Sequence, residues 1–101
     1  MQHIVRMSSE AEADLNNITY YLEYLTGGQK ASENFRIELE KDIRLIAFEP
    51  RLFGYSRLKE LKEKGYRTFL IKGYIALYII DKEEVTITNI FHQSQDYARL
   101  I

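Results

Sequence analysis

The side chains best suited to chemistry lie in the last third of the chain, Gly65–Ile101. Arg67 can hold a phosphate through two parallel hydrogen bonds, because its guanidinium is planar and always charged. His92 can act as a general acid or base, since an imidazole titrates near neutral pH. Tyr97 can donate a proton or stack on another ring. Together these three are the candidate catalytic residues.

Each candidate also has a structural interpretation. Arg67 can be a strand-face cation paired with a carboxylate, and Tyr97 can pack its ring against a sheet. The only other histidine, His3, is expected to be a strand residue with no role. Because the two histidines lie far apart and the chain has no cysteine, we predict neither a metal site nor a cofactor.

Basic residues are concentrated between Pro50 and Leu77, where seven Lys and Arg face two Glu. This segment predicts a partner-binding surface for phosphates or an acidic protein. The candidate partner-binding residues are Lys59, Lys62, Lys64, Arg67 and Lys72. A solvated face, balanced by acidic helices, is the simpler interpretation. A net charge of −1 argues against strong non-specific binding to nucleic acid.

Length and composition limit the class of protein. The 101 residues are predicted to form one domain, residues 1–101. The absence of cysteine excludes a disulfide framework and suits a reducing cytoplasm, which we take as the expected location. No signal peptide is expected at the N-terminus. No apolar run approaches the roughly 20 residues that span a bilayer, so no membrane partner is predicted.

The first half of the chain predicts a strand and a helix. His3–Met7 alternates between two faces, as a strand does. Ser9–Glu12 is predicted to be a capping box that begins a helix. Apolar residues then recur every three or four positions, at Ala11, Leu15, Ile18, Leu22 and Leu25. Gly27 and Gly28 are predicted to end this helix.

A second helical stripe follows, formed by Ala31, Phe35, Leu39, Ile43 and Ile46. It is expected to end before Pro50, whose ring disfavours helical backbone in the preceding residue. Nine acidic residues fall between Ser8 and Glu49. The two helices therefore predict an antiparallel hairpin with an acidic outer face.

The remaining segment predicts a meander of strands. In Pro50–Lys64, apolar residues are expected to anchor a loop, with Leu58–Leu61 as a short strand or turn. Strands are predicted at Tyr66–Ile71, Tyr74–Ile80 and Val85–Phe91, and a short helix at Gln95–Leu100. A turn at Lys72-Gly73 joins the first two strands.

These elements predict an α+β fold in the order β-α-α-β-β-β. In this arrangement, the helical hairpin packs on one face of a small antiparallel sheet, and a short C-terminal helix follows. The first strand must join the sheet to satisfy its backbone amides, most simply beside a late strand.

Three segments in this order resemble the RelE/ParE superfamily, the toxins of bacterial type II toxin–antitoxin pairs. They read SSEAEADLNNITYYL, GYRTFLIKGYIALYIID and IFHQSQDYARLI. The resemblance spans nearly the whole chain. It implies a toxin that inhibits growth and is held inactive by an antitoxin protein, whose flexible segment wraps around it. An acidic antitoxin would complement the basic Arg51–Lys72 region through helix or strand-edge contacts.

The resemblance implies one of two activities. RelE-like members are ribosome-dependent endoribonucleases that cut messenger RNA, whereas ParE-like members inhibit DNA gyrase by binding it. Ribonuclease members commonly place an arginine after an aromatic residue in the second meander strand, but Ile75 follows Tyr74 here. In the ParE-like interpretation, His92 and Asp96 make structural hydrogen bonds in the tail. We therefore favour a ParE-like, non-catalytic toxin. The alternative is a RelE-like ribonuclease that uses Arg67, His92 and Tyr97.

Overall fold

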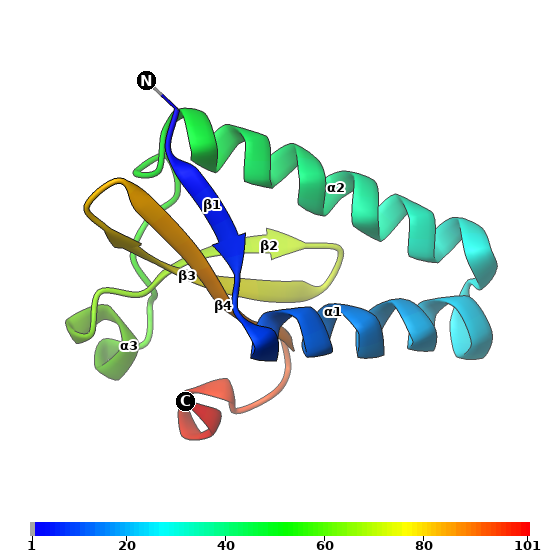
Figure 1. The fold of residues 1–101 in the computed structure, drawn as a ribbon. Helices are drawn as coiled ribbons and strands as arrows, with labels where there is room; N and C mark the ends of the chain where they lie inside the picture. The colour runs from blue at the N-terminus through cyan, green and yellow to red at the C-terminus, as the bar shows by residue number, and fades with distance from the viewer. Residues whose placement is uncertain (1) are drawn as a thin grey trace.

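A four-stranded sheet in the order β1–β4–β3–β2 forms the centre of the computed structural model, which describes residues 2–101 (Figure 1). The strands are β1 (Ile4–Met7), β2 (Arg67–Ile71), β3 (Tyr74–Asp81) and β4 (Glu84–His92). The helices are α1 (Ser9–Tyr21), α2 (Gly28–Phe48) and the short α3 (Lys59–Glu63). A π-helical turn (Leu22–Thr26) extends α1, and a 3₁₀ turn (Tyr97–Leu100) follows β4. The predicted α+β class and order of elements are confirmed.

The sheet is mixed. Strands β2, β3 and β4 are antiparallel neighbours, as predicted, whereas β1 runs parallel to β4 from Ile4 opposite Glu84 to Met7 opposite Ile87. The expectation that the first strand lies beside a late one is also confirmed. The parallel direction is possible because a long connection, containing both main helices and two strands, separates β1 from β4.

Helix α1 begins at Ser9, so the helix and its cap each start one residue earlier than predicted. The cap is Ser8, whose Oγ accepts a hydrogen bond from the Ala11 N–H at 3.0 Å, so the predicted Ser9–Glu12 capping box is wrong. The backbone N–H of Ser8 donates to the Ile87 carbonyl at 2.9 Å, and its hydroxyl donates to the Thr88 carbonyl at 2.8 Å. These bonds to β4 hold Ser8 in extended backbone, which is the conformation of an N-cap residue.

The predicted row of apolar residues that faces the core from α1 is confirmed except at Leu25, its last member. Ala11 and Ile18 are buried, and Leu15 and Leu22 pack against the core, but Leu25 is 65% exposed. The π-helical turn explains this difference, because its wider hydrogen-bonded loops rotate Leu25 away from the sheet.

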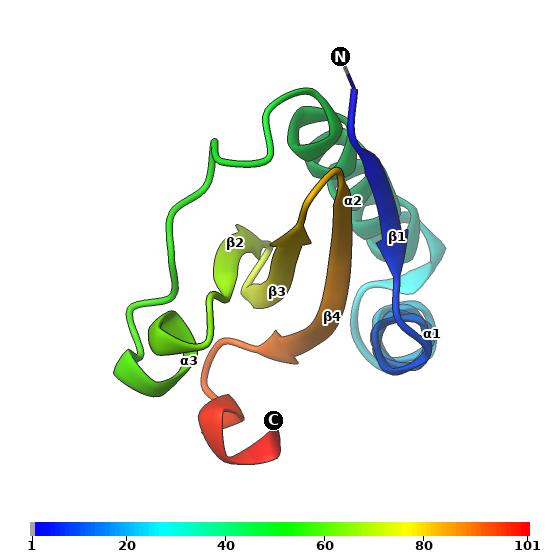
Figure 2. The ribbon, with the colours of Figure 1, turned by 60° about the vertical axis from the view of Figure 1, so that its left-hand side comes forward.

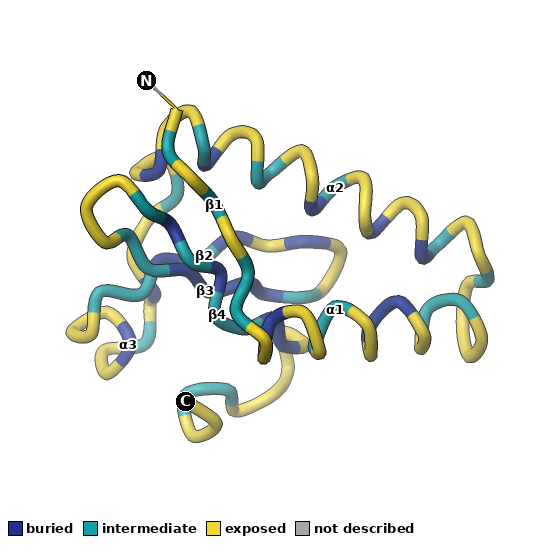
Figure 3. The backbone as a smooth tube through the Cα atoms, viewed as in Figure 1, coloured by how far each residue is buried: buried dark blue, intermediate teal, exposed yellow. Residues whose placement is uncertain are grey.

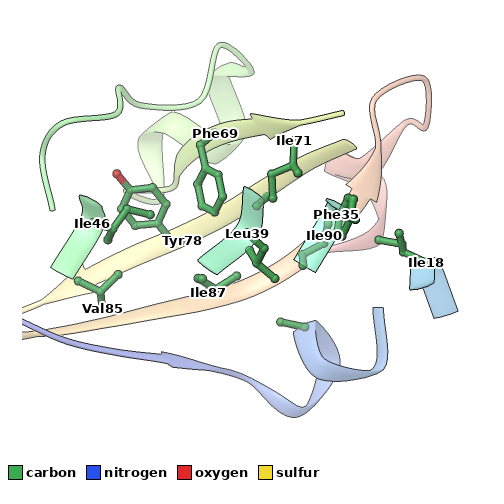
Figure 4. Close-up of a cluster of buried hydrophobic side chains, with 12 residues drawn as sticks. Ile18, Phe35, Leu39, Ile46, Phe69, Ile71, Tyr78, Val85, Ile87 and Ile90 are labelled. Carbon is green, nitrogen blue, oxygen red and sulfur yellow. The ribbon is translucent and has the colours of Figure 1, made fainter. Parts of the chain in front are cut away.

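Helix α2 supplies the main contacts to the sheet. Phe35, Leu39 and Ile46 are buried against Phe69, Tyr78 and other residues of the strands (Figure 4). The helix ends at Phe48, before Pro50 as predicted. No helix within residues 2–101 combines the length and the apolar character needed to cross a bilayer.

The opposite face of the sheet is covered as well. Figure 2 shows α1 and α2 on one side of the sheet and α3 with the C-terminal turn on the other. A second apolar cluster lies there, formed by the buried residues Leu61, Ile75, Leu77 and Phe91. Leu61 belongs to α3, so the predicted strand or turn at Leu58–Leu61 is wrong. A single turn of helix buries Leu61 while its charged neighbours remain exposed.

Candidate functional site

Arg67 is a buried residue that holds a loop in place. Its side chain points to the α2 side of the sheet, and the residue is only 9% exposed. The guanidinium donates to the Phe53 carbonyl at 2.8 Å and lies 4.0 Å from the centre of the Tyr55 ring. A backbone bridge also joins Tyr55 to Arg67. Arg67 thus ties the loop before α3 to the edge of the sheet.

Tyr78 holds the same loop from the neighbouring strand. It lies opposite Arg67 in the register of β2 and β3, and its hydroxyl donates to the Pro50 carbonyl at 2.8 Å. Burial raises the pKa of Tyr78 to about 12, although the positive charge of Arg67 acts in the opposite direction. The hydroxyl is therefore neutral at physiological pH and serves as a hydrogen-bond donor.

His92 lies at the far end of β4. Its ring meets Tyr74 edge to face, with ring centres 5.2 Å apart, and Tyr74 in turn meets Phe35 at 5.4 Å. The His92 Nδ1 lies 2.7 Å from the Ser94 Oγ. The Gln95 Oε1 accepts a hydrogen bond from the His92 backbone N–H at 2.8 Å. These contacts order the turn that leads into the C-terminal segment.

Tyr97 packs on the other face of the sheet. Its ring stacks on Phe91, with centres 5.9 Å apart and planes 12° from parallel. This contact belongs to the cluster that also contains Leu61 and Leu77.

The three candidate catalytic residues do not converge. Arg67 lies opposite Tyr78 and His92 opposite Tyr74, and these two positions are four residue steps apart along β3, which is about 13 Å. Tyr97 lies on the opposite face of the sheet from the Arg67 side chain. The fold therefore does not assemble an acid, a base and a phosphate-binding cation from these residues.

A cavity of about 480 Å³ lies where the loop, the β2 edge and the C-terminal segment meet. Its lining residues are Gly54, Tyr55, Arg57, Thr68, Phe69, Leu70, Ile75, Gln93 and Tyr97. Arg57 is the one charged side chain among them. A second cavity of about 430 Å³ shares Tyr55 and Arg57 and adds Ser56 and Lys62. The cavities thus combine aromatic rings with cations along the β2 edge.

Sequence reasoning missed Tyr55 as a site residue and counted Arg57 only as part of the basic segment. The available signal was an aromatic residue close to a cation in the least regular part of the chain. Apolar residues recur at regular intervals in strands and helices, but this loop has no such period. Its shape depends on contacts with distant residues, so the sequence does not indicate which of its side chains meet.

The five candidate partner-binding residues form no single surface. Lys59, Lys62 and Lys64 are exposed in or directly after α3. Within residues 2–101, none of them lies in an ion pair. Lys72 is exposed in the β2–β3 turn with φ of 45°, at the opposite end of β2 from α3 (Figure 1). Arg67 is buried between them, so only the three lysines near α3 remain one basic surface.

Comparison with known proteins decides the family. Residues 5–97 match the model of a family described as the ParE toxin of the type II toxin–antitoxin system parDE. The chain belongs to the ParE toxin family. It is thus a toxin of a type II toxin–antitoxin system within the RelE/ParE superfamily. No curated protein matches its sequence.

Solved structures show the same fold as this ParE-family toxin. A chain of the chromosomal ParDE toxin–antitoxin system from P. aeruginosa matches with a TM-score of 0.65 and 21% identity, over 90% of this chain and 96% of that chain. A chain of the toxin–antitoxin complex RelBE2 from Mycobacterium tuberculosis matches with a TM-score of 0.62 and 20% identity, over 91% of this chain and 99% of that one. Both toxin–antitoxin systems therefore include a chain with this fold.

In this ParE-family toxin, Ile75 occupies the position where the resemblance to ribonuclease members leads one to look for an arginine. Its side chain is 7% exposed and belongs to the apolar cluster with Leu77 and Phe91, at the wall of the larger cavity. An apolar group at this position offers nothing to stabilise negative charge on a phosphate.

Proposed function

We propose that this ParE-family toxin arrests bacterial growth by binding an essential protein, with DNA gyrase as the expected target, and that it is not a nuclease. The separation of Arg67, His92 and Tyr97 is the observation that carries this proposal. Cutting RNA requires groups that act on one phosphate at the same time. Binding a protein requires only an exposed surface of suitable chemistry.

The surface best suited to a protein target combines the two cavities with the lysines near α3. Tyr55 is 50% exposed and Leu70 is 60% exposed, and Arg57 lies beside them in the cavity wall. Aromatic and arginine side chains next to apolar ones are the composition typical of energetically important contacts between proteins.

We also propose that an antitoxin covers part of this toxin in the cytoplasm. Both similar structures are described as toxin–antitoxin assemblies, which supports a partner of that kind. Lys59, Lys62 and Lys64 provide an exposed basic surface for an acidic antitoxin segment. Opposite charges across such an interface speed association and select the partner.

The alternative is a RelE-like endoribonuclease that cuts messenger RNA on translating ribosomes. One observation favours it: Arg57 and Lys62 line a cavity together with Tyr55, and Tyr97 lines the adjoining cavity. Cations beside aromatic rings can bind RNA phosphates and stack on bases. A nuclease of this kind would use a site other than the one that Arg67 and His92 suggested.

Two assays with the purified toxin separate these functions. In the first, gyrase relaxes or supercoils plasmid DNA in the presence of the toxin. In the second, translating ribosomes carry a defined message that is analysed for cuts. The proposal predicts inhibition in the gyrase assay and an intact message. Cleavage that appears only with ribosomes would overturn it, and a chain that neither arrests growth nor acts in either assay would also contradict it.

A further inference from the structure

The backbone of one residue separates the two long helices. Gly27 ends the π-helical turn and precedes α2, and its φ of −110° and ψ of −3° lie in the right-handed helical region. Gly28 is the one residue within residues 9–48 that has a positive φ, which is 78°. A Cβ added there meets no atom of residues 2–101 within 4 Å, so Gly28 is needed for its backbone conformation and not for space. A change of Gly28 to helical dihedral angles therefore joins α1 and α2.

The junction between the helices is weakly capped. The beginning of α2 accepts no hydrogen bond from a capping side chain, and the first turn of this helix contains no carboxylate. The last turn before Gly27 contains no cation. A helix end leaves orphan N–H and C=O groups, which such caps and charges stabilise. A continuous helix pairs these groups along its own backbone, which favours opening of the junction.

Large exposed side chains surround the same junction. Tyr20 is 61% exposed, Tyr21 is 47% exposed, and Tyr24 and Leu25 are both 65% exposed. We call these four residues the hinge patch. The rings of Tyr20 and Tyr24 lie 4.9 Å apart and form one surface. In Figure 3 most of the backbone around the tip of the hairpin is exposed. A cluster of this kind is typical of a surface that binds a partner.

The hinge patch alone is too small to hold two copies of the chain together. A buried aromatic side chain covers about 150–250 Å², and these residues expose roughly half to two thirds of that, which gives about 400 Å² for each copy. Two such patches in contact bury about 800 Å² in total, whereas a stable interface buries about 1,200–2,000 Å². A dimer therefore needs further contacts, and the open junction supplies them.

We propose that two copies of this chain exchange β1 and α1, with Gly28 as the hinge. In the exchanged dimer, the continuous helix of residues 9–48 extends about 60 Å. It carries β1 and α1 to the sheet of the other copy, while α2 stays on its own sheet. The two long helices run antiparallel, as α1 and α2 do in the hairpin (Figure 1), and the hinge patches meet at the two-fold axis.

The contacts that join the two copies already exist within the single chain. Strand β1 pairs with β4, Asp14 accepts a hydrogen bond from the Ile90 N–H at 2.9 Å, and Ser8 donates to the Thr88 carbonyl at 2.8 Å. In the exchanged dimer these bonds form between copies, so their interface adds to that of the hinge patch. The second copy is the occupant because it carries the surfaces that β1 and α1 fit. The target and the antitoxin take no part, so this inference is independent of the proposed function.

The first test changes the hinge. Gly28→Ala strains the closed hairpin, because residues with a Cβ disfavour a left-handed backbone, and it also favours a continuous helix. We expect an effect of about tenfold at each hinge, and so a rise of about a hundredfold in the association constant of the dimer. The chains are unfolded and refolded at several concentrations, so that exchange can occur. Size-exclusion chromatography with light scattering then measures the dimer.

Gly73→Ala is the matched control. Gly73 has φ of 88° in the β2–β3 turn, and a Cβ added there also meets no atom of residues 2–101 within 4 Å. Its strain is the same in the single chain and in the dimer, so Gly73→Ala should associate as the parent chain does. Equal association of the Gly28 and Gly73 variants would overturn the inference, because destabilisation alone would then explain it.

A disulfide distinguishes exchange from simple contact. The chain has no cysteine, and Arg6 lies opposite Thr86 in the parallel pair of β1 and β4. Neighbouring strands lie about 4.8 Å apart, which a disulfide can span. With Arg6→Cys and Thr86→Cys, oxidation links β1 to β4 within a monomer but links two chains in the exchanged dimer. The dimer fraction of the Gly28→Ala chain should therefore run as a covalent dimer on a denaturing gel without reductant.

The hinge patch is tested in the Gly28→Ala chain. Tyr20→Gln with Tyr24→Gln should lower the association constant about tenfold, because the rings no longer meet at the two-fold axis. Leu52→Gln with Leu100→Gln removes apolar groups that are 54% and 60% exposed outside the hinge. This second pair should leave the association constant unchanged.

The same cysteine pair in the parent chain, refolded at high concentration, keeps the test independent of how Gly28→Ala folds. Covalent dimers in the dimer fraction support the exchange. A dimer fraction that yields only single chains means that intact hairpins associate through the hinge patch, and the inference is then wrong. The absence of any dimer from both the parent and the Gly28→Ala chains counts equally against it.

Discussion

Arg67 and Tyr78 face each other across β2 and β3, and both side chains hold the same loop. Arg67 donates to the Phe53 carbonyl at 2.8 Å, and the Tyr78 hydroxyl donates to the Pro50 carbonyl at 2.8 Å and lies 3.5 Å from that of Phe53. This pair fixes the Pro50–Tyr55 segment, which leads to the cavities and to α3. The residue first considered for catalysis thus positions the surface proposed to bind a target.

Replacing Tyr78 with Phe should destabilise the fold. The change leaves the Pro50 carbonyl without its buried donor, at a cost of about 1–3 kcal/mol in the free energy of unfolding. Urea denaturation measures the change. Tyr55→Phe is the matched control, because the Tyr55 ring remains under Arg67 and its hydroxyl makes no hydrogen bond within residues 2–101. Equal stability of the two variants would mean that the Pro50 contact is unimportant.

Replacing Arg67 with Lys should lower stability more than it lowers the toxin's specific activity. Lys keeps the charge but loses the planar group that reaches the Phe53 carbonyl and stacks on Tyr55. We expect a loss of about 1–3 kcal/mol in the free energy of unfolding. Growth arrest at low temperature, where the variant is folded, should persist. Loss of arrest in a variant of normal stability would instead indicate a direct functional role.

Replacing His92 with Gln should leave growth arrest intact. Its ring contacts Tyr74 and Ser94, and no second candidate catalytic group lies near it, so only the contribution of an aromatic pair, about 0.5–1.5 kcal/mol, should be lost. Toxicity in cells and thermal denaturation of the purified variant are the two measurements. A chain that remains folded but loses toxicity would revive the ribonuclease alternative.

Asp14 should make stability fall as pH rises. Burial raises its pKa above 3.8, opposed by the hydrogen bond that it accepts from the Ile90 N–H at 2.9 Å. The folded state then binds the proton more tightly than the unfolded state, so this contribution is favourable at low pH and is lost as pH rises through the folded pKa. Asp14→Asn keeps an acceptor for Ile90 and should flatten this part of the curve.

Denaturant titrations between about pH 3.5 and 7 check this expectation. Asp42 also has a pKa raised by burial, with Glu38 acting in the same direction, so part of the slope should remain in Asp14→Asn. Glu12→Gln, at an exposed position of the same helix, is the control. An identical slope in the parent chain and in Asp14→Asn would contradict the role assigned to Asp14.

Charge reversal near α3 should weaken antitoxin binding, whereas the same change in the β2–β3 turn should not. Lys62→Glu and Lys72→Glu alter net charge equally, but Lys62 lies beside Arg57 and Lys72 lies at the other end of β2. Affinity and its dependence on salt are measured for both. If Lys62→Glu binds as tightly as the parent chain, the docking surface near α3 is wrong.

The sequence by itself determined the four strands, the two long helices and their order. The spacing of Ala11, Leu15 and Ile18, the alternation of Val85–Phe91 and the stop before Pro50 all depend on neighbours within a few residues. Such local patterns follow from the periods of the helix and the strand, which are 3.6 and 2 residues. For the same reason the family resemblance could be seen in the sequence before the fold was known.

Only the tertiary structure decided what the candidate site residues do. Arg67 meets a carbonyl 14 residues away, Asp14 meets an amide 76 residues away, and β1 pairs with β4 across most of the chain. Spacing contains no information on such partners, because they depend on how the sheet and loop pack. The fold therefore separated Arg67 from His92 and Tyr97.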